Sequence, residues 1–110
     1  MTLRDAGLAI WKAGLEAGRI RPLFQRALSL EGPRLRAGSD FFDLDRIRRL
    51  LVLGVGKASG AMAEALEELL GDRITCGLVV GKEGNTAPTR RIRRVEAGHP
   101  VPDARGLRAA

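Results

Sequence analysis

The sequence LLVLGVGKASGAMAEALEELL, residues 50–70, decides the fold. An almost unbroken apolar run over residues 50–55 is typical of a β-strand that is covered on both faces. A glycine-rich turn follows it. Residues 58–70 then place apolar side chains at helical spacing, with acidic side chains on the other side. The stretch therefore predicts a buried strand, a tight turn and a helix.

Two later apolar runs extend this pattern. Residues 74–80 and 92–97 read as further strands, so a strand, a helix and a strand follow one another within a short span. This order predicts a βαβ unit with parallel strands. We therefore expect an α/β fold, in which N-terminal helices precede a Rossmann-like, three-layer parallel sheet that is incomplete with these strands alone.

The first part of the chain has the pattern of two helices. Thr2 and Asp5 have the spacing of a capping box, and an amphipathic stretch continues from them to about Ala17. Pro22 suits the first turn of a second, short helix, which we expect to reach Leu30.

A connector rich in turn residues follows the second helix. Two glycine-containing pairs within residues 32–39 predict an irregular segment, and we expect Phe41 and Phe42 to anchor it to the body of the protein. The chain thus divides into an N-terminal helical segment with its connector, residues 1–44, and the first part of an α/β domain, residues 45–110.

Length and composition exclude several classes of protein. With 110 residues, 45% of them apolar and 29% charged, the chain is one soluble globular domain or a piece of one. No apolar run approaches the roughly 18 residues that indicate a membrane span, and the N-terminus does not resemble a signal peptide. Cys76 is the only cysteine, which excludes an internal disulfide and a cysteine metal cluster. We expect a cytoplasmic protein with no membrane partner and no metal ligands of its own.

The net charge of +6 comes mainly from arginine. Arginines are concentrated in two short runs, within residues 46–49 and 90–94, each beside a predicted strand. A basic surface can bind nucleic acid, but base stacking needs aromatic side chains between the basic residues, and these runs contain none. Solvated strand edges or a partner surface explain the runs better, so no nucleic acid partner is expected. Lysine is rare, which draws attention to Lys57.

The turn after the first strand is a candidate anion-binding site. Ligands of parallel α/β sheets bind at the carboxyl ends of the strands, close to helix N-termini. Gly54 and Gly56 allow the backbone to approach an anion, Lys57 adds positive charge, and Ser59 lies where the helix begins. A lysine in the first turn of a helix opposes the helix dipole, so a purely structural turn is the weaker interpretation.

Two nucleotide-binding motifs fit this turn poorly. A Walker A loop requires Gly-x-x-x-x-Gly-Lys-Ser/Thr, but here an apolar residue replaces the first glycine and Ala58 replaces the hydroxyl residue. A dinucleotide fingerprint requires Gly or Ala where Ser59 lies, and an acid near the end of the second strand, where Gly81-Lys82 lies. A phosphate or carboxylate site of another family is the interpretation that remains.

A rigid segment follows the third strand. Residues 96–103 read EAGHPVPD, with two prolines after the only histidine of the chain. Prolines fix the backbone, so His99 is presented from a stiff loop, where it could serve as a general base or a substrate ligand. The alternative is structural: the ring bonds a backbone carbonyl, and Asp103 caps a helix.

Together these segments resemble the N-terminal part of the glycerate kinases of the MOFRL-associated type, whose relatives were long named hydroxypyruvate reductases. The resemblance is carried by residues 53–59 with Met62-Ala63, by residues 77–80 and, above all, by residues 96–103. It covers most of the chain, but the chain is only a part of such an enzyme.

The resemblance implies a transfer of phosphate from ATP to D-glycerate, with Mg²⁺, in a cleft between two α/β domains. Lys57 matches the lysine of the family's glycine-lysine turn and would neutralise the transferred phosphoryl group or orient the glycerate. Gly54, Gly56 and His99 would border the same cleft. The family's nucleotide loop and second domain are absent from this sequence. We therefore expect the nucleotide-binding residues beyond Ala110, and no activity from the chain alone.

Two other functions stay open. One is an NAD(P)H-dependent oxidoreductase of the hydroxypyruvate reductase type, against which Ser59 and the missing ribose-binding acid count. The other is a small basic binding module without catalytic activity. An incomplete sheet also exposes apolar surface, so we expect the isolated chain to associate, as a homo-oligomer for example, or to be partly disordered.

Overall fold

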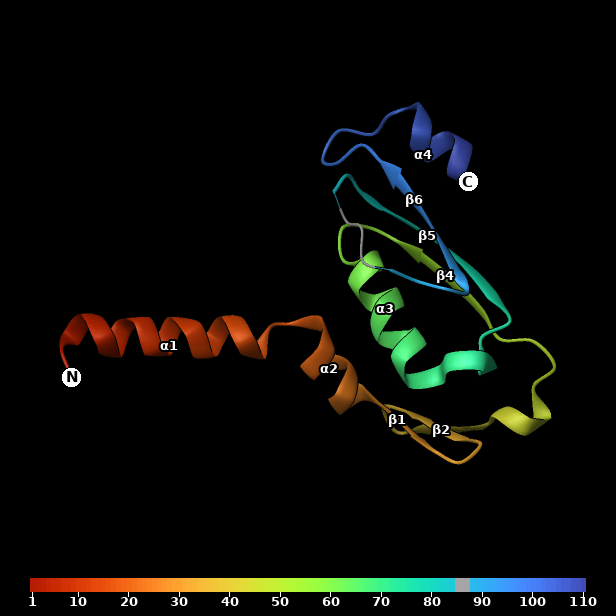
Figure 1. Ribbon diagram of the computed structural model, residues 1–110, viewed down its shortest axis with the longest axis horizontal. Helices are drawn as coiled ribbons and strands as arrows, with labels where there is room; N and C mark the ends of the chain where they lie inside the picture. Colours follow the sequence, from red (N-terminus) through yellow and green to blue (C-terminus); the bar gives the residue numbers. More distant parts are fainter. Residues whose placement is uncertain (85–87) are drawn as a thin grey trace.

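The computed structural model describes residues 1–84 and 88–110, and within them it contains four α-helices and two small β-sheets (Figure 1). An antiparallel sheet in the order β1-β2-β3 precedes a parallel sheet in the order β4-β5-β6. The helices are α1 (Leu3–Ala17), α2 (Ile20–Ala27), α3 (Ser59–Leu70) and α4 (Ala104–Ala109), with short 3₁₀ helices at Leu44–Arg46 and Gly71–Arg73. The strands are β1 (Leu28–Glu31), β2 (Arg34–Ala37), β3 (Asp40–Asp43), β4 (Leu51–Val55), β5 (Cys76–Lys82) and β6 (Ile92–Ala97).

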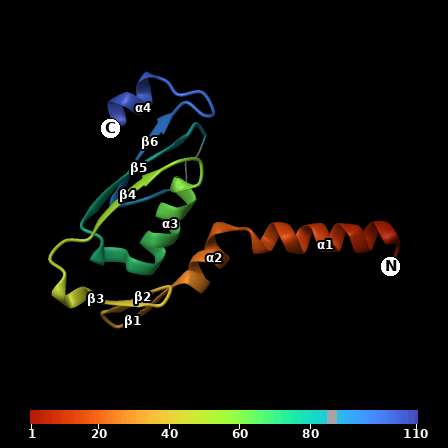
Figure 2. The ribbon, with the colours of Figure 1, turned by 180° about the vertical axis from the view of Figure 1, so that it is seen from behind.

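Helix α1 begins at the predicted capping box. The Thr2 hydroxyl accepts a hydrogen bond from the Asp5 backbone N–H at 3.1 Å, and the Asp5 carboxylate accepts one from the Thr2 N–H at 2.9 Å. These bonds to Thr2 hold the pKa of Asp5 below its usual range. The helix projects away from the rest of the protein in both views (Figure 1 and Figure 2), and none of its residues is buried.

The prediction for the segment after α1 is wrong in two respects. Helix α2 ends at Ala27 instead of Leu30, and the expected irregular connector is the antiparallel sheet β1-β2-β3. The physical reason lies in the turns. Gly32 and Gly38 have φ angles of 55° and 62°, and each is the first residue of a short hairpin turn, a position that requires positive φ. The glycine pairs therefore mark hairpins.

Phe41 and Phe42 do not anchor this segment as expected. The two residues are 53% and 46% exposed. The ring of Phe41 instead lies against the Arg34 guanidinium, whose central carbon is 3.9 Å from the ring centre. The antiparallel sheet meets the core through Leu30 and Leu35 instead, which pack against the buried cluster, and Leu44, directly after β3, is part of that cluster.

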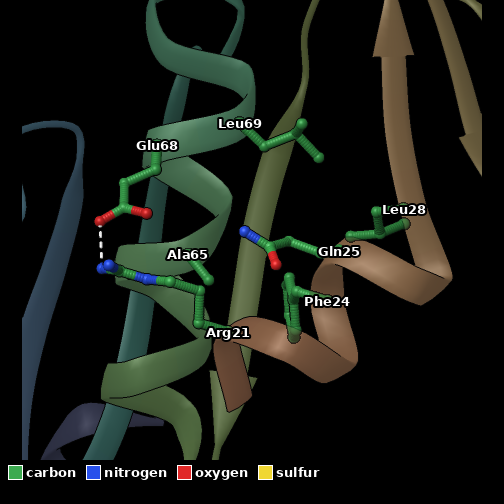
Figure 3. A pocket seen from close by; sticks show the side chains of 7 residues that line it. All are labelled: Arg21, Phe24, Gln25, Leu28, Ala65, Glu68 and Leu69. Carbon is green, nitrogen blue, oxygen red and sulfur yellow. Dashed lines mark hydrogen bonds and ion pairs between the residues drawn. The ribbon is translucent and has the colours of Figure 1, made fainter. Parts of the chain in front are cut away.

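Helix α2 lies beside α3, as the close-up in Figure 3 shows. A small cavity of about 220 Å³ separates them, lined by Arg21 and Phe24 on one side and by Ala65 and Glu68 on the other. The Arg21 guanidinium donates a hydrogen bond to the Glu68 carboxylate. Both partners are exposed, and such pairs contribute at most about 1 kcal/mol. The ion pair therefore contributes little to the packing of the two helices.

The parallel sheet follows the predicted βαβ order. Strand β4 and helix α3 each begin slightly later than expected, β5 is shifted toward the C-terminus, and β6 has the predicted bounds. The register pairs Val55 with Val80 and Lys82 with Ala97. The carboxyl ends of the three strands therefore lie side by side at one edge of the sheet.

Helix α3 covers one face of this sheet. Ala63 of α3 packs with Val79 and Ile92 in the core, where burying a side chain such as Ile contributes roughly 1.5–3 kcal/mol. On the opposite face, Leu53 and Val55 are 82% and 88% exposed. The prediction that β4 is covered on both faces is therefore wrong for the part of the chain that the structure describes. The reason is that α4, on this side, packs against β6.

Glu67 ties α3 to the start of β6. Its carboxylate accepts hydrogen bonds from the backbone N–H groups of Arg90, Arg91 and Ile92 at 2.7, 2.6 and 2.8 Å. Partial desolvation raises the pKa of Glu67, but the three N–H groups together outweigh it and the pKa is lowered. The Arg91 side chain also donates to the Asp72 carboxylate at 3.1 Å. Part of the second arginine run is thus occupied within the fold.

The loop between β6 and α4 is closely packed around Gly98. A Cβ atom at Gly98 would lie 2.4 Å from the Val101 carbonyl oxygen and 2.7 Å from the Asp103 carboxylate. The Asp103 carboxylate accepts a hydrogen bond from the Arg105 backbone N–H at 3.0 Å and so caps α4, as the structural interpretation of this segment predicted. The contacts around Gly98 leave no room for a side chain.

Replacing Glu67 by alanine should lower the free energy of unfolding by about 1–3 kcal/mol, because three backbone N–H groups lose a charged acceptor. Glu68→Ala is the matched control, since loss of an exposed ion pair should cost less than about 1 kcal/mol. Chemical denaturation at neutral pH compares the two variants, and equal losses would contradict the role of Glu67.

The effect of Glu67 should also depend on pH. Its pKa is lowered in the folded state, so its stabilisation is present above the ordinary glutamate pKa and is lost as the pH falls through the lowered value. The difference in stability between Glu67→Ala and the unchanged protein should therefore shrink in acid. A difference that stays constant would exclude an ionised Glu67 as its cause.

Replacing Gly98 by alanine should lower the free energy of unfolding by roughly 1–3 kcal/mol, because the loop must move to admit the methyl group. Gly106→Ala in α4 is the control, since its Cβ would meet only an ordinary contact, 3.9 Å from the Ala97 Cβ. Thermal unfolding measures both. A Tm for Gly98→Ala equal to that of Gly106→Ala would show that the loop has room for a methyl group at Gly98.

Candidate active site

The turn of residues 54–60 is held against β5 by one carbonyl group. The Val80 carbonyl oxygen accepts hydrogen bonds from the Gly56 backbone N–H at 2.9 Å and from the Ser59 hydroxyl at 3.0 Å. The Ser59 N–H in turn donates to the Gly56 carbonyl at 3.1 Å. Lys57 lies between these two anchored residues, so its backbone is fixed just beyond the carboxyl end of β4.

Both glycines that the sequence singled out are required by the local geometry. Gly56 has a φ of 119°, a backbone conformation that side chains rarely allow. A Cβ at Gly54 would lie 2.8 Å from Cγ1 of Val79. Glycine at this position therefore permits the close approach of β4 to its neighbours beneath α3.

Ser59 lies in a different place from the other candidates. It is only 4% exposed, and its hydroxyl is bonded to the Val80 carbonyl. It is not among the residues that line the large cavity at this end of the sheet. Its position is suited to holding the turn.

The carboxyl ends of the three parallel strands border one cavity of about 500 Å³. Its lining includes Gly106 and Ala109 of α4 but no residue of α3. Apolar side chains of β4 and β5 line its base, namely Leu53, Val55, Leu78 and Val80. The structure brings four candidates to this cavity: Gly54, Gly56, Lys57 and His99. His99 is exposed, and its peptide bond to Pro100 is cis.

Sequence reasoning missed a second lysine at this cavity. Lys82 is the last residue of β5, and the alternation along a strand places it on the same face as Val80. It lines the cavity together with Lys57 and His99. The signal was present in the sequence, because a lysine occupies the region where dinucleotide-binding sites carry an acid. Each of three neighbouring strands thus directs a basic or titratable residue to the cavity.

Asp103 also lines the cavity, but its charge is paired. The Arg105 guanidinium donates to the Asp103 carboxylate at 2.6 and 3.0 Å and is the main cause that lowers the pKa of Asp103 to about 2. Arg105 forms a second ion pair with Glu83, and its own pKa is raised by these two carboxylates, by Asp103 most of all. Because its carboxylate is paired with Arg105 and its pKa is low, Asp103 is a weak proton acceptor and poorly suited to act as a general base.

The cavity suits an anion better than a divalent cation. Lysine and histidine donate hydrogen bonds or positive charge, whereas Mg²⁺ and Ca²⁺ prefer carboxylate and carbonyl oxygens. Within residues 1–84 and 88–110, no group of three or more His, Cys, Asp and Glu residues could hold a metal ion. No helix in the same residues is long and apolar enough to cross a membrane.

Comparison with known proteins gives consistent relatives. Residues 6–110 match the family model described as a domain of unknown function, DUF4147. The D-glycerate 2-kinase of Thermotoga maritima is 43% identical over 103 residues, 93% of this chain and 21% of that protein. The glycerate 2-kinase of Pyrococcus horikoshii is 27% identical over 110 residues, which is 100% of this chain and 24% of that protein. A protein of Agrobacterium vitis, provisionally named a hydroxypyruvate reductase, is 48% identical over 62 residues, 56% of this chain and 16% of its own.

Two solved structures share the fold. A Pyrococcus horikoshii protein superimposes with a TM-score of 0.82 at 27% identity, over 100% of this chain and 24% of that one. The glycerate kinase of Thermotoga maritima gives a TM-score of 0.68 at 29% identity, over 96% of this chain and 22% of that one. The chain thus spans 16% to 24% of the length of its curated relatives. These findings confirm the expected fold class and the resemblance to glycerate kinases. With the family model matching nearly its whole length, the chain belongs to the DUF4147 family.

Proposed function

We propose that this chain is the N-terminal part of a glycerate kinase, which transfers a phosphoryl group from ATP to D-glycerate and forms 2-phosphoglycerate. The observation that carries the proposal is the cavity at the ends of the three parallel strands, where Lys57 is held by an anchored turn. The names of two relatives, which are called glycerate 2-kinases, support the choice of substrate.

The residues at the cavity fit the electrostatic demands of this reaction. Phosphoryl transfer depends mainly on positioning and on stabilising negative charge. Lys57 would neutralise charge on the transferred group or orient the glycerate carboxylate. The apolar base of the cavity strengthens such a contact, because charges interact more strongly away from bulk water. In this proposal Gly56 keeps the phosphate side free of a side chain, Gly54 lets β4 pack closely beneath α3, Ser59 holds the turn, and His99 shapes the opposite wall.

ATP and Mg²⁺ are the cofactors that the resemblance implies. ATP would supply the phosphoryl group when bound. The described residues do not fit a Mg²⁺ site, because the carboxylate at the cavity, Asp103, is bonded to Arg105. We therefore assign no step to the metal, and we expect its ligands and those of the nucleotide outside residues 1–110.

An NAD(P)H-dependent reductase is the second candidate, favoured by the provisional name of the Agrobacterium vitis relatives. The dinucleotide fingerprint is incomplete at Ser59, whose side chain is used within the turn. Lys82 at the end of β5 cannot bind the ribose diol as an acid would, although it could pair with the 2′-phosphate of NADPH. Fluorescence titration with NADH and NADPH separates this candidate from the kinase.

A basic binding module is the third candidate. Its second arginine run is partly committed to the fold, since Arg91 pairs with Asp72. This occupation favours the kinase. Retention on DNA that weakens steeply with salt would support the binding module instead.

Replacing Lys57 by alanine in the full protein that contains this segment should lower kcat for glycerate phosphorylation about 10²–10³-fold, because a positive charge near the transferred group is lost. The residue is exposed, so circular dichroism and Tm should not change. Lys12→Ala, which removes an exposed lysine from α1, is the matched control. An unchanged kcat for Lys57→Ala would remove Lys57 from the mechanism.

Purified residues 1–110 should not phosphorylate D-glycerate, because the chain spans so small a share of the related kinases. A coupled assay for ADP measures this, with the full protein as the positive control. Formation of ADP by residues 1–110 above the background without glycerate would contradict the prediction.

A further inference from the structure

Building on the proposed function, we infer that Lys82 is a second anion-binding residue of the cavity and that the cavity takes a ligand with two separate anionic groups. The chemical class is a small molecule that carries both a carboxylate and a phosphate. Lys82 would bind the phosphate and Lys57 the carboxylate. Among the compounds of the proposed reaction, 2-phosphoglycerate carries both a carboxylate and a phosphate, whereas D-glycerate carries only the carboxylate.

Both lysines lie near the carboxyl ends of neighbouring strands. Lys82 is the last residue of β5, and Lys57 lies in the turn that follows β4, whose last residue Val55 pairs with Val80. The two residues border the same cavity, so one ligand in that cavity can contact both of them.

Lys82 points to the cavity because of its place in β5. Leu78 and Val80 share its face of the sheet and line the cavity, whereas Val79, on the other face, is buried beneath α3. In the part of the chain that the structure describes, the Lys82 ammonium takes part in no hydrogen bond or ion pair. Because Lys82 is exposed, its ammonium is open to an anionic ligand that enters the cavity.

Two acids near Lys82, Glu83 and Asp103, are paired with Arg105. Arg105 binds the Asp103 carboxylate at the cavity and the carboxylate of Glu83, the residue next to Lys82. Arg105 therefore occupies the two groups that would otherwise compete with a ligand for the lysine. Lys82 borders the cavity, and the acids Asp103 and Glu83 are paired with Arg105. This arrangement favours a negatively charged ligand.

The test measures binding by isothermal titration calorimetry in the full protein, with 2-phosphoglycerate and D-glycerate as the two probes. Lys82→Ala should weaken 2-phosphoglycerate about ten- to hundredfold, as expected for loss of a charged hydrogen bond. It should weaken D-glycerate much less, so the ratio of the two affinities changes. Lys82→Arg should restore most of the affinity, and Lys12→Ala is the control for loss of an exposed lysine.

The outcomes separate this inference from the proposed function. If the unchanged protein binds both compounds and Lys82→Ala matches Lys12→Ala, the role of Lys82 is refuted while the kinase proposal stands. If Lys82→Ala weakens both compounds equally, the two-anion ligand is refuted. If the unchanged protein binds neither compound, the proposed function fails and this inference fails with it. Should Lys82→Ala fold poorly, Lys82→Gln gives the same comparison with a side chain of similar length.

Discussion

The carbonyl oxygen of Val80 holds the candidate site together. It accepts hydrogen bonds from the Gly56 backbone and the Ser59 hydroxyl, and so fixes both sides of Lys57 to the neighbouring strand. Without these bonds, the turn between β4 and α3 would be a glycine-rich loop with little to define its path. With these bonds, the backbone of Lys57 is held at the edge of the cavity at the carboxyl ends of the strands. The site depends on the parallel register of β4 and β5 for the same reason, because the register sets where Val80 lies.

Charge around the cavity is arranged by pairing. The acids at the rim are bound to Arg105, and Glu67 on the far side of the sheet holds the backbone of the second arginine run. The basic composition of the chain therefore does not form one continuous surface. Lys57 and Lys82 line the cavity at the ends of the parallel strands, which is where α/β proteins bind anions.

Much of the fold could be predicted from local patterns. The capping box at Thr2, the bounds of β6 and the strand-turn-helix order after Leu50 need only neighbouring residues to specify them. The antiparallel sheet was missed because its strands are very short, and the glycine pairs that join them also occur in irregular loops. Phe41 was misplaced because hydrophobicity alone does not distinguish a ring in the core from one that lies against an arginine.

By itself, the sequence determined the α/β class, the position of the glycine-lysine turn and the stiffness of the loop at His99, since each follows from the conformational limits of a few adjacent residues. Only the tertiary structure decided which of these features meet. It brought Lys57, Lys82 and His99 to one cavity, although many residues separate them, because parallel strands align their carboxyl ends. It also placed the Ser59 hydroxyl against β5, because a buried hydroxyl needs a hydrogen-bond partner and the Val80 carbonyl supplies it.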